Sequence, residues 1–232
     1  MAEHVLRLVG VGVDYRTPGG TVTAVSDVSL DVPSRGITVL AGPSGSGKST
    51  LLRVLSLVER PTLGNVELRG VGTARLSNRA RRALRRTDVA LVFQNPGDNL
   101  IGHLSVGDNL RAAAQSAGRP ERVDEVLDRL GLPGTAGWKV PALSGGQQQR
   151  LAFGCALARG ATVVLADEPT SQLDTASADL VLETLVDLSR RGVPVVVASH
   201  DPRLIALADT CFTLRDGALG RDGALGRDGE LA

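Results

Sequence analysis

The chain has 232 residues, a formal net charge of +1 and only 2% aromatic residues, which fits one α/β domain with an aliphatic core. The near-neutral charge argues against non-specific nucleic-acid binding as the main activity, because such binding depends on a strong basic excess. Residues 1–9 lack the apolar core of a signal peptide, and no apolar run approaches the roughly 18 residues of a membrane helix, so we expect a soluble, cytoplasmic protein.

The first part of the chain alternates short apolar runs with turn signals. Strands are expected at residues 5–9, 22–25, 28–32 and 37–40, with turns at residues 18–20 and 33–36. Tyr15, the only tyrosine, follows the first of these strands. Its ring is expected either to pack on the strand surface or to form a platform for a nucleotide base.

Residues 42–50 read Gly-Pro-Ser-Gly-Ser-Gly-Lys-Ser-Thr and lie between an expected strand and a helix expected at residues 51–58. That order is the context in which a phosphate-binding loop forms. Its glycines let successive N–H groups converge on an anion, and the positive end of the helix adds to their attraction. Lys48 would reach the β- and γ-phosphates and Ser49 would hold Mg²⁺, so we expect the chain to bind a nucleoside triphosphate.

A strand expected at residues 64–68 precedes a basic segment at residues 75–86. Six arginines lie in this segment: Arg75, Arg79, Arg81, Arg82, Arg85 and Arg86. Such a run is typical of the solvated face of a helix, and a nucleic-acid patch is the alternative. The apolar strand at residues 89–93 then ends at Gln94, and residues 104–131 show helical spacing with a break at residues 118–120.

Residues 143–150 read Leu-Ser-Gly-Gly-Gln-Gln-Gln-Arg and open an apolar helix that is expected to reach Ala158. Ser144 is a favourable N-cap, and the N–H groups that follow it are unpaired at the start of the helix. The segment is therefore a second candidate anion site, far from the first in sequence.

Two carboxylates, Asp167 and Glu168, follow an apolar strand expected at residues 162–166. Open α/β sheets place their chemistry at the carboxyl ends of the strands. Asp167 can join the Mg²⁺ shell, as the acidic partner of a phosphate loop does, and Glu168 can act as a general base on water. The alternative is a polar strand end without a catalytic role.

A helix is expected at residues 175–190, followed by a strand at residues 193–198 that leads to His200. At that edge His200 can bond a γ-phosphate oxygen, or it can have only a structural or capping role. A helix at residues 202–208 and a strand at residues 210–214 complete the expected fold.

The tail repeats the six-residue sequence Arg-Asp-Gly-Ala-Leu-Gly, once at residues 215–220 and again at 221–226, and a third copy begins at residue 227. Two copies and a fraction are too few for a stacked β-helix. We expect a loose or hairpin-like tail, with docking to a partner as the alternative.

Taken in this order, the motifs resemble the ATP-binding subunits of ABC transporters over residues 5–217. The resemblance implies an α/β fold: a P-loop NTPase (RecA-like) core with an N-terminal antiparallel β subdomain and an inserted helical signature subdomain. It implies one ABC ATPase domain at residues 1–217, with a core lobe at 1–94 and 159–217 and a helical subdomain at 95–158. The repetitive tail covers residues 218–232.

The resemblance also implies two cofactors, ATP and Mg²⁺, and a head-to-tail dimer in which two subunits enclose two ATP molecules. Each ATP would lie between the phosphate loop of one subunit and the Ser144 helix of the other. The implied nucleotide contacts are Tyr15, Gly42, Ser44, Gly45, Gly47, Lys48, Ser49, Thr50, Ser144, Gly145, Gly146, Gln147 and Asp174. The implied metal-binding residues are Ser49, Gln94 and Asp167, and the implied catalytic residues are Lys48, Gln94, Glu168 and His200.

The function implied is an ATPase subunit that powers a membrane permease at the cytoplasmic face of the membrane, most similar to lipoprotein-release and macrolide-efflux types. An amino-acid importer ATPase is the alternative. Chromosome-maintenance or repair ATPases would carry long coiled coils between Gln94 and Ser144, and the chain has no sustained heptads there. Translation-associated relatives carry two cassettes, and Glu168 and His200 argue against a module that binds ATP without hydrolysing it. No nucleic-acid partner is expected.

Overall fold

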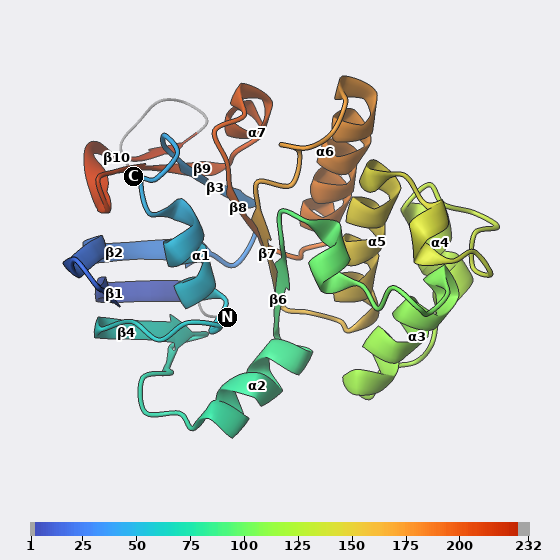
Figure 1. Ribbon diagram of the computed structural model, residues 1–232, viewed down its shortest axis with the longest axis horizontal. Coiled ribbons are helices and arrows are strands. Elements are labelled where there is room, and N and C mark those ends of the chain that lie inside the picture. The colour runs from blue at the N-terminus through green and yellow to red at the C-terminus, as the bar shows by residue number, and fades with distance from the viewer. Residues whose placement is uncertain (1–2, 227–232) are drawn as a thin grey trace.

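The computed structural model describes the backbone of residues 3–226 and the side chains of residues 3–220. Two β-sheets and the helices packed on them form the described part of the chain (Figure 1). The strands are β1 His4–Thr17, β2 Gly20–Pro33, β3 Ile37–Ala41, β4 Leu63–Leu68, β5 Val71–Gly72, β6 Val89–Val92, β7 Val163–Asp167, β8 Val195–Ala198, β9 Thr210–Arg215 and β10 Ala218–Gly226. The α-helices are α1 Lys48–Leu55, α2 Asn78–Thr87, α3 Val106–Ser116, α4 Val123–Arg129, α5 Gly145–Ala158, α6 Thr175–Arg190 and α7 Pro202–Ala206, with short 3₁₀ helices at Pro96–Asn99 and Val140–Ala142.

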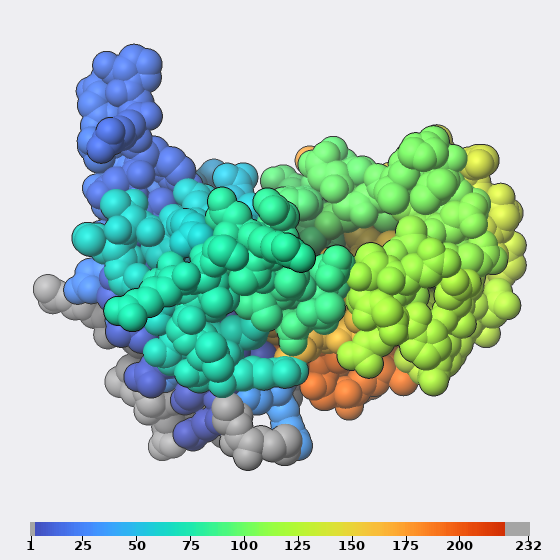
Figure 2. Space-filling view, turned by 90° about the horizontal axis from the view of Figure 1, so that it is seen from below, coloured from blue at the N-terminus to red at the C-terminus, as the bar shows by residue number. Residues whose placement is uncertain are grey.

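The first sheet is antiparallel, in the order β2-β1-β4-β5, and the far end of its β1–β2 hairpin projects from the body of the molecule (Figure 2). The two strands expected at residues 22–25 and 28–32 are one strand, β2, which pairs with β1 on both sides of an irregularity. Asp27 has a left-handed backbone there, with φ of 48°. This bulge breaks the alternation of apolar residues, which is why the sequence pattern divides the strand in two.

The second sheet has the order β10-β9-β3-β8-β7-β6, with β9, β3, β8, β7 and β6 parallel and β10 antiparallel at one edge. Side chains along its central strands alternate between two buried clusters. Val39 and Val164 face the cluster formed with α3 to α6, whereas Leu40 and Leu165 face the cluster formed with α1 and the antiparallel sheet. The strands are therefore buried on both faces, as expected of a parallel sheet.

Three helices, α3, α4 and α5, separate β6 from β7 in sequence and lie beyond the edge of the sheet that ends in β6 (Figure 1). The break expected at residues 118–120 is confirmed, because α3 ends at Ser116 and α4 begins at Val123. In contrast, the helix expected at residues 51–58 ends at Leu55, since Leu57 turns the chain with φ of 60°. In the part of the chain that the structure describes, none of the helices has the length and apolarity required to cross a membrane.

The tail forms a hairpin, as expected, since β10 pairs antiparallel with β9. Asp216 and Gly217 make the turn, both with positive φ. Gly217 also joins the hairpin to the rest of the fold: its carbonyl accepts a hydrogen bond from the Ser26 amide at 2.8 Å, and its own amide donates to the Ser46 carbonyl at 3.1 Å. The third copy of the repeat begins at residue 227, outside the described residues.

Candidate functional site

The glycine-rich loop connects the carboxyl end of β3 to the first turn of α1, so its backbone lies at the edge where parallel strands end. Gly42 and Gly47 have φ of 145° and 97°, values that side chains rarely allow. A Cβ atom on Gly42 would lie 2.3 Å from the Leu214 carbonyl oxygen, and one on Gly47 would lie 2.5 Å from that of Ala24. The loop conformation thus requires glycine at both positions.

A cavity of about 330 Å³ opens above this loop. Its walls combine the loop with residues that follow other strands of the sheet. The lining residues are Ala24, Ser44, Gly45, Gly47, Lys48, Ser49, Thr50, Gln94, Glu168, Ser171 and His200. The sheet topology therefore brings together side chains that are more than a hundred positions apart in sequence, such as Lys48 and Glu168.

Lys48 begins α1 and is only 5% exposed. Its ammonium group donates hydrogen bonds to the carbonyl oxygens of Gly42 at 2.8 Å and Pro43 at 3.0 Å. The same nitrogen lies 3.7 Å from a carboxylate oxygen of Glu168. A buried cation at the mouth of a loop of free N–H groups is suited to a polyanion.

Asp167 ends β7 beside α1, and its Oδ1 accepts a hydrogen bond from the Ser49 hydroxyl at 2.9 Å. Burial raises the pKa of the Asp167 carboxyl above its ordinary value, and the charge of Glu168 adds to the increase, while the Ser49 hydrogen bond opposes it. A half-buried carboxylate next to a hydroxyl matches the oxygen donors that Mg²⁺ prefers. Within residues 3–220 no cluster of three His, Cys, Asp or Glu side chains could hold a metal, so a cation here needs further oxygen donors.

Glu168 follows Asp167 with a left-handed backbone, φ of 43°, a conformation that is costly for a residue with a side chain. One carboxylate oxygen lies 2.9 Å from Nδ1 of His200, and the other accepts a hydrogen bond from the Ser199 hydroxyl at 3.1 Å. The carboxylate is therefore held from two sides and directed into the cavity that it lines.

Gln94 follows β6 and donates a hydrogen bond from Nε2 to the Ser171 hydroxyl at 3.1 Å, across the cavity wall. Tyr15 lies on β1, partly buried against the core cluster that contains α1, and burial raises the pKa of its hydroxyl, which the nearby side chains of Thr50 and Glu59 also influence. The packing role expected for Tyr15 is therefore observed, with the ring near the first turn of α1.

The second candidate anion site lies apart from this cavity, whose lining within the described residues includes none of Ser144 to Gln147. Ser144 caps α5 in a reciprocal arrangement: its hydroxyl accepts from the Gln147 amide at 3.3 Å, and the Gln147 side chain accepts from the Ser144 amide at 2.8 Å. Ser144 and Gly145 are exposed, whereas Gly146 packs so closely on α6 that a Cβ atom would lie 2.8 Å from that of Ser177. Asp174 caps α6 through Ser177.

Two residues of the site were not singled out in the sequence. Ser199 is fully buried; its hydroxyl donates to Glu168 and accepts from the Asp201 amide at 3.1 Å, which links the carboxylate to the start of α7. Ser171 receives the Gln94 hydrogen bond and donates to the Glu168 carbonyl at 3.0 Å. Only their positions in the sequence could have indicated these two serines, since each lies within three residues of a predicted site residue.

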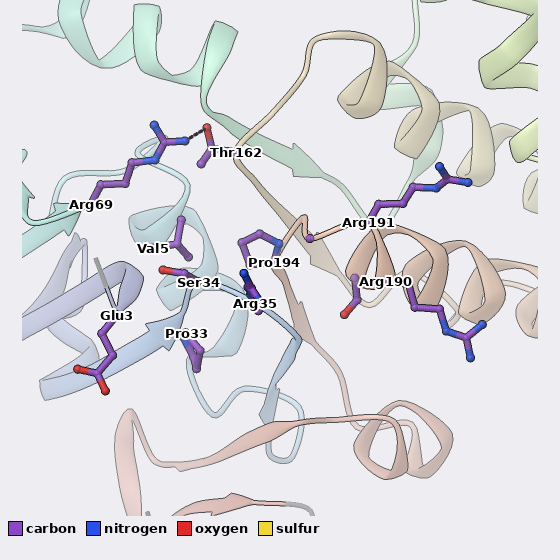
Figure 3. Close-up of a pocket in the computed structure, with 12 residues that line it drawn as sticks. Glu3, Val5, Pro33, Ser34, Arg35, Arg69, Thr162, Arg190, Arg191 and Pro194 are labelled. Atoms are coloured by element: carbon purple, nitrogen blue, oxygen red, sulfur yellow. Dashed lines mark hydrogen bonds between the residues drawn. The ribbon is translucent and has the colours of Figure 1, made fainter. Parts of the chain in front are cut away.

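A larger cavity, about 1130 Å³, lies at the opposite edge of the parallel sheet, near the starts of β3 and β8 (Figure 3). Its polar groups do not converge on one point. Arg69 donates to the Thr162 hydroxyl at 2.7 Å, while Arg190 and Arg191 extend away from Val5 and Pro33. Size alone therefore does not mark the functional site, which is defined by the convergent polar groups above the loop.

We expect that replacing Asp167 with asparagine will raise the melting temperature of the nucleotide-free protein at pH 7 by about 2 °C or more. Because burial makes the pKa of this carboxyl higher in the folded than in the unfolded chain, its ionisation costs stability above that pKa. This cost in stability disappears as the pH falls below the pKa that the carboxyl has in the unfolded chain. Thermal unfolding measured from pH 4 to pH 8 should show that the difference in melting temperature between the variant and the wild type decreases as the pH is lowered.

The control for this experiment is Asp201→Asn, for which we expect the melting temperature to change in the opposite direction. A hydrogen bond from Arg203 is the main cause that lowers the pKa of Asp201, so the stability it contributes is present at neutral pH and is lost as the pH falls. Asp201→Asn should lower the melting temperature at pH 7. A change of the same sign in the melting temperature of both variants would contradict the stability cost assigned to ionised Asp167.

Comparison with known proteins gives one consistent family. The sequence pattern of the family described as "ABC transporter" matches residues 25–171. The chain is 38% identical over 222 residues to "Macrolide export ATP-binding/permease protein MacB" of Bradyrhizobium diazoefficiens, covering 94% of this chain and 34% of that protein. It is 37% identical to a "Probable export ATP-binding/permease protein" of Pseudomonas fluorescens, with the same coverage of both chains. The chain thus spans about a third of the length of these curated relatives.

Solved structures agree with the sequence matches. "Dimeric structure of a post-hydrolysis state of the ATP-binding cassette MJ0796 bound to ADP and Pi" superposes with a TM-score of 0.83 at 30% identity and covers 96% of this chain and 98% of that one. CbiO1 from Clostridium perfringens, part of the ABC transporter complex cbiONQ, has a TM-score of 0.82 at 26% identity, covering 94% of this chain and 87% of that one. The expected fold class, a P-loop NTPase core with an antiparallel subdomain, is confirmed by these matches.

Proposed function

The chain belongs to the ABC transporter family and is an ATPase, and from that premise we propose that it powers export through a membrane permease. The observation that carries the proposal is the cavity in which Lys48, Glu168 and His200 surround the end of a phosphate-type loop. Export rather than import is favoured by the relatives, whose names describe export ATP-binding/permease proteins. We propose that the permease holds the chain at the cytoplasmic face of the membrane.

ATP would bind with its phosphates against the loop. In that state the Lys48 ammonium would exchange its contacts with the Gly42 and Pro43 carbonyls for β- and γ-phosphate oxygens. Backbone N–H groups of the loop and of the first turn of α1, up to Thr50, would bind the remaining charge. Tyr15, tethered near Thr50, lies where its ring would stack on the base.

Ser49, Asp167 and Gln94 would hold Mg²⁺. The 2.9 Å Ser49–Asp167 hydrogen bond joins two of these donors, and burial raises the pKa of Asp167 above its ordinary value. When bound, the ion neutralises charge on the β- and γ-phosphates. Phosphate oxygens would complete the donor set that the protein side chains alone leave short.

Glu168 would accept a proton from the water that attacks the γ-phosphate. Its carboxylate is fixed by Ser199 and lies next to His200, so its position does not depend on the nucleotide. We assign His200 the γ-phosphate contact, since it lines the same cavity. Ser199 would act as a positioning residue, because its hydroxyl touches the carboxylate and not the reacting atoms.

A second copy of the chain would complete the site. Ser144 and Gly145 are exposed at the start of α5, where the first backbone N–H groups have no carbonyl partner within the helix, and none of residues 144–147 lines the cavity. In a head-to-tail dimer this start would meet the γ-phosphate bound by the other subunit, with Asp174 nearby at the start of α6. ATP would then join two subunits, and hydrolysis would release them.

We expect Ser144→Ala to slow ATP hydrolysis by roughly tenfold or more, with little change in the ATP affinity of the monomer. The hydroxyl accepts from Gln147 and retains its own proton, which it can donate across the interface. Turnover and ATP titration of the monomer would be measured on the same preparation. The matched control is Ser105→Ala, which removes the equivalent cap of α3 and should leave turnover unchanged. Normal turnover in Ser144→Ala would contradict the composite site.

The permease would dock in a groove of about 420 Å³ between the sheet and the helical subdomain, for which we propose the limits 95–158. Residues 1–94 and 159–217 would form the core lobe. Two large apolar side chains that line the groove, Val58 and Ile101, are 47% and 44% exposed. Phe93, directly before Gln94, also lines it, so a segment docked there would contact the loop that reaches the nucleotide.

The proposal is tested by isolating the Glu168→Gln protein from its native membranes with ATP and Mg²⁺ and identifying what co-purifies. An export permease with few membrane helices and a large outer domain is the expected result. A permease accompanied by a solute-binding protein would replace export by import. Recovery of DNA or repair factors without a membrane protein would overturn the transport function.

A further inference from the structure

The segment between Glu67 and Asp88 is strongly cationic. It contains no acidic residue and carries these arginines: Arg69, Arg75, Arg79, Arg81, Arg82, Arg85 and Arg86. The whole chain, in contrast, has a net charge of only +1. This local excess lies mostly on α2, and ATP binding as described above does not use it.

Two of these arginines anchor the helix. Arg81, 2% exposed, donates to the carbonyl oxygens of Leu57 at 3.0 Å and Glu59 at 2.6 Å, and Arg85 donates to the Leu57 carbonyl at 2.6 Å. Both side chains thus fasten α2 to the turn that follows α1. This structural role accounts for the inward face of the helix only.

The exposed arginines are Arg79, Arg82 and Arg86 on the outward face of α2 and Arg75 in the segment before it; we call these four the arginine patch. All four are exposed, and none forms a hydrogen bond or ion pair through its side chain within the described residues. Arg79 and Arg82 are three positions apart and Arg82 and Arg86 four, spacings at which like charges repel on a helix. The first turn of α2 has no acidic residue to offset Arg79. The repulsion among the three helical arginines is unfavourable, and an external anion would relieve it.

The position of α2 indicates which anion this is. Arg85 lines the groove proposed for the permease, together with Val58 and Ile101. Figure 2 looks onto the face where α2 and α3 both lie, the side that would be turned to a permease in this groove. We propose that the arginine patch binds anionic phospholipid headgroups at the membrane surface beside the permease. The position of the patch beside the permease rests on the proposed function. Its charge, and the lack of ion pairs to its four arginines among the described residues, do not.

A nucleic acid is the less suitable ligand for this patch. The α2 segment, residues 75–87, contains no aromatic side chain that could stack on a base. A bilayer that contains anionic lipids attracts basic side chains near its surface by about 1 kcal/mol each. The exposed arginines on one short helix match such a surface.

The test is co-sedimentation of the purified chain with vesicles of phosphatidylcholine alone or with about one third phosphatidylglycerol, a surface that attracts basic side chains. The wild type should bind only the anionic vesicles. The triple variant Arg79→Gln, Arg82→Gln, Arg86→Gln should bind them about a hundredfold more weakly, with unchanged ATP hydrolysis and a melting temperature no lower than that of the wild type. These vesicles contain no permease, so the result is independent of whether the chain powers one.

The matched control is the triple variant Arg111→Gln, Arg122→Gln, Arg129→Gln, which removes the same charge from arginines that are paired with carboxylates in the helical subdomain. It should retain wild-type binding. Equal loss in both triple variants, or equal binding to neutral vesicles, would overturn the proposal. So would absence of vesicle binding together with patch-dependent retardation of RNA in a gel.

Discussion

Replacing Lys48 with alanine should lower the affinity for ATP by about a hundredfold or more and remove detectable hydrolysis at ordinary ATP concentrations. Lys48 is the only lysine at the site; the other lysine of the chain is Lys139. Its ammonium lies at the mouth of the loop, 3.7 Å from a carboxylate oxygen of Glu168, and in the proposed complex it would contact both the β- and the γ-phosphate. No neighbouring cation of the cavity lining can replace it among the described residues, apart from a protonated His200.

The measurement is titration of a fluorescent ATP analogue into the purified variant, with Lys139→Ala as the control. Lys139 is held at the surface by the His103 carbonyl and lies outside the cavity, so its removal should leave affinity unchanged. Loss of Lys48 also frees the Gly42 and Pro43 carbonyls, so the melting temperature must be measured to exclude unfolding. ATP affinity within a fewfold of wild type, in a folded Lys48→Ala protein, would contradict the phosphate-loop assignment.

The fold was predictable where local pattern and tertiary environment agree. The parallel strands are short apolar runs because both faces are buried, and the loop at Gly42 follows one of them, so strand, loop and helix were evident together. The β1–β2 hairpin was harder, because the bulge at Asp27 interrupts the period of two. The short strand β5 was missed, since Val71 and Gly72 are exposed and their pairing with β4 leaves no pattern in the sequence.

The residues of the site were predictable individually, but their contacts were not. Asp167 and Glu168 were identified as a pair, yet their different environments depend on two other elements: Ser49 of α1 contacts one carboxylate, and Ser199, which follows β8, contacts the other. Ser199 carries no signal of its own, because a buried serine after a strand is common. The distance between the Ser144 helix and the cavity likewise depends on how α5 packs on α6, which the sequence does not state.

Replacing Glu168 with glutamine should reduce ATP turnover by about 10²- to 10⁴-fold while ATP binding is kept. The amide has nearly the shape of the carboxylate, so it can still accept from the Ser199 hydroxyl and stay beside His200, but it cannot take a proton from water. The left-handed backbone at this position is also preserved, because glutamine has the same steric demand as glutamate. Only the proton-accepting step is removed.

With hydrolysis blocked, the ATP-bound dimer should accumulate, since hydrolysis is the step that would separate the subunits. Light scattering after size-exclusion chromatography should show a dimer for Glu168→Gln with ATP and Mg²⁺, and a monomer without ATP. Adding Ser144→Ala to this variant should weaken the dimer, because the start of α5 is proposed to hold the γ-phosphate of the other subunit. The surface control Glu183→Gln, on α6, should turn over ATP normally and stay monomeric after hydrolysis. Turnover near wild type in Glu168→Gln would exclude Glu168 as the base and leave the proton to be taken by another group in the cavity, of which His200, 2.9 Å from the same carboxylate, is the first to be tested.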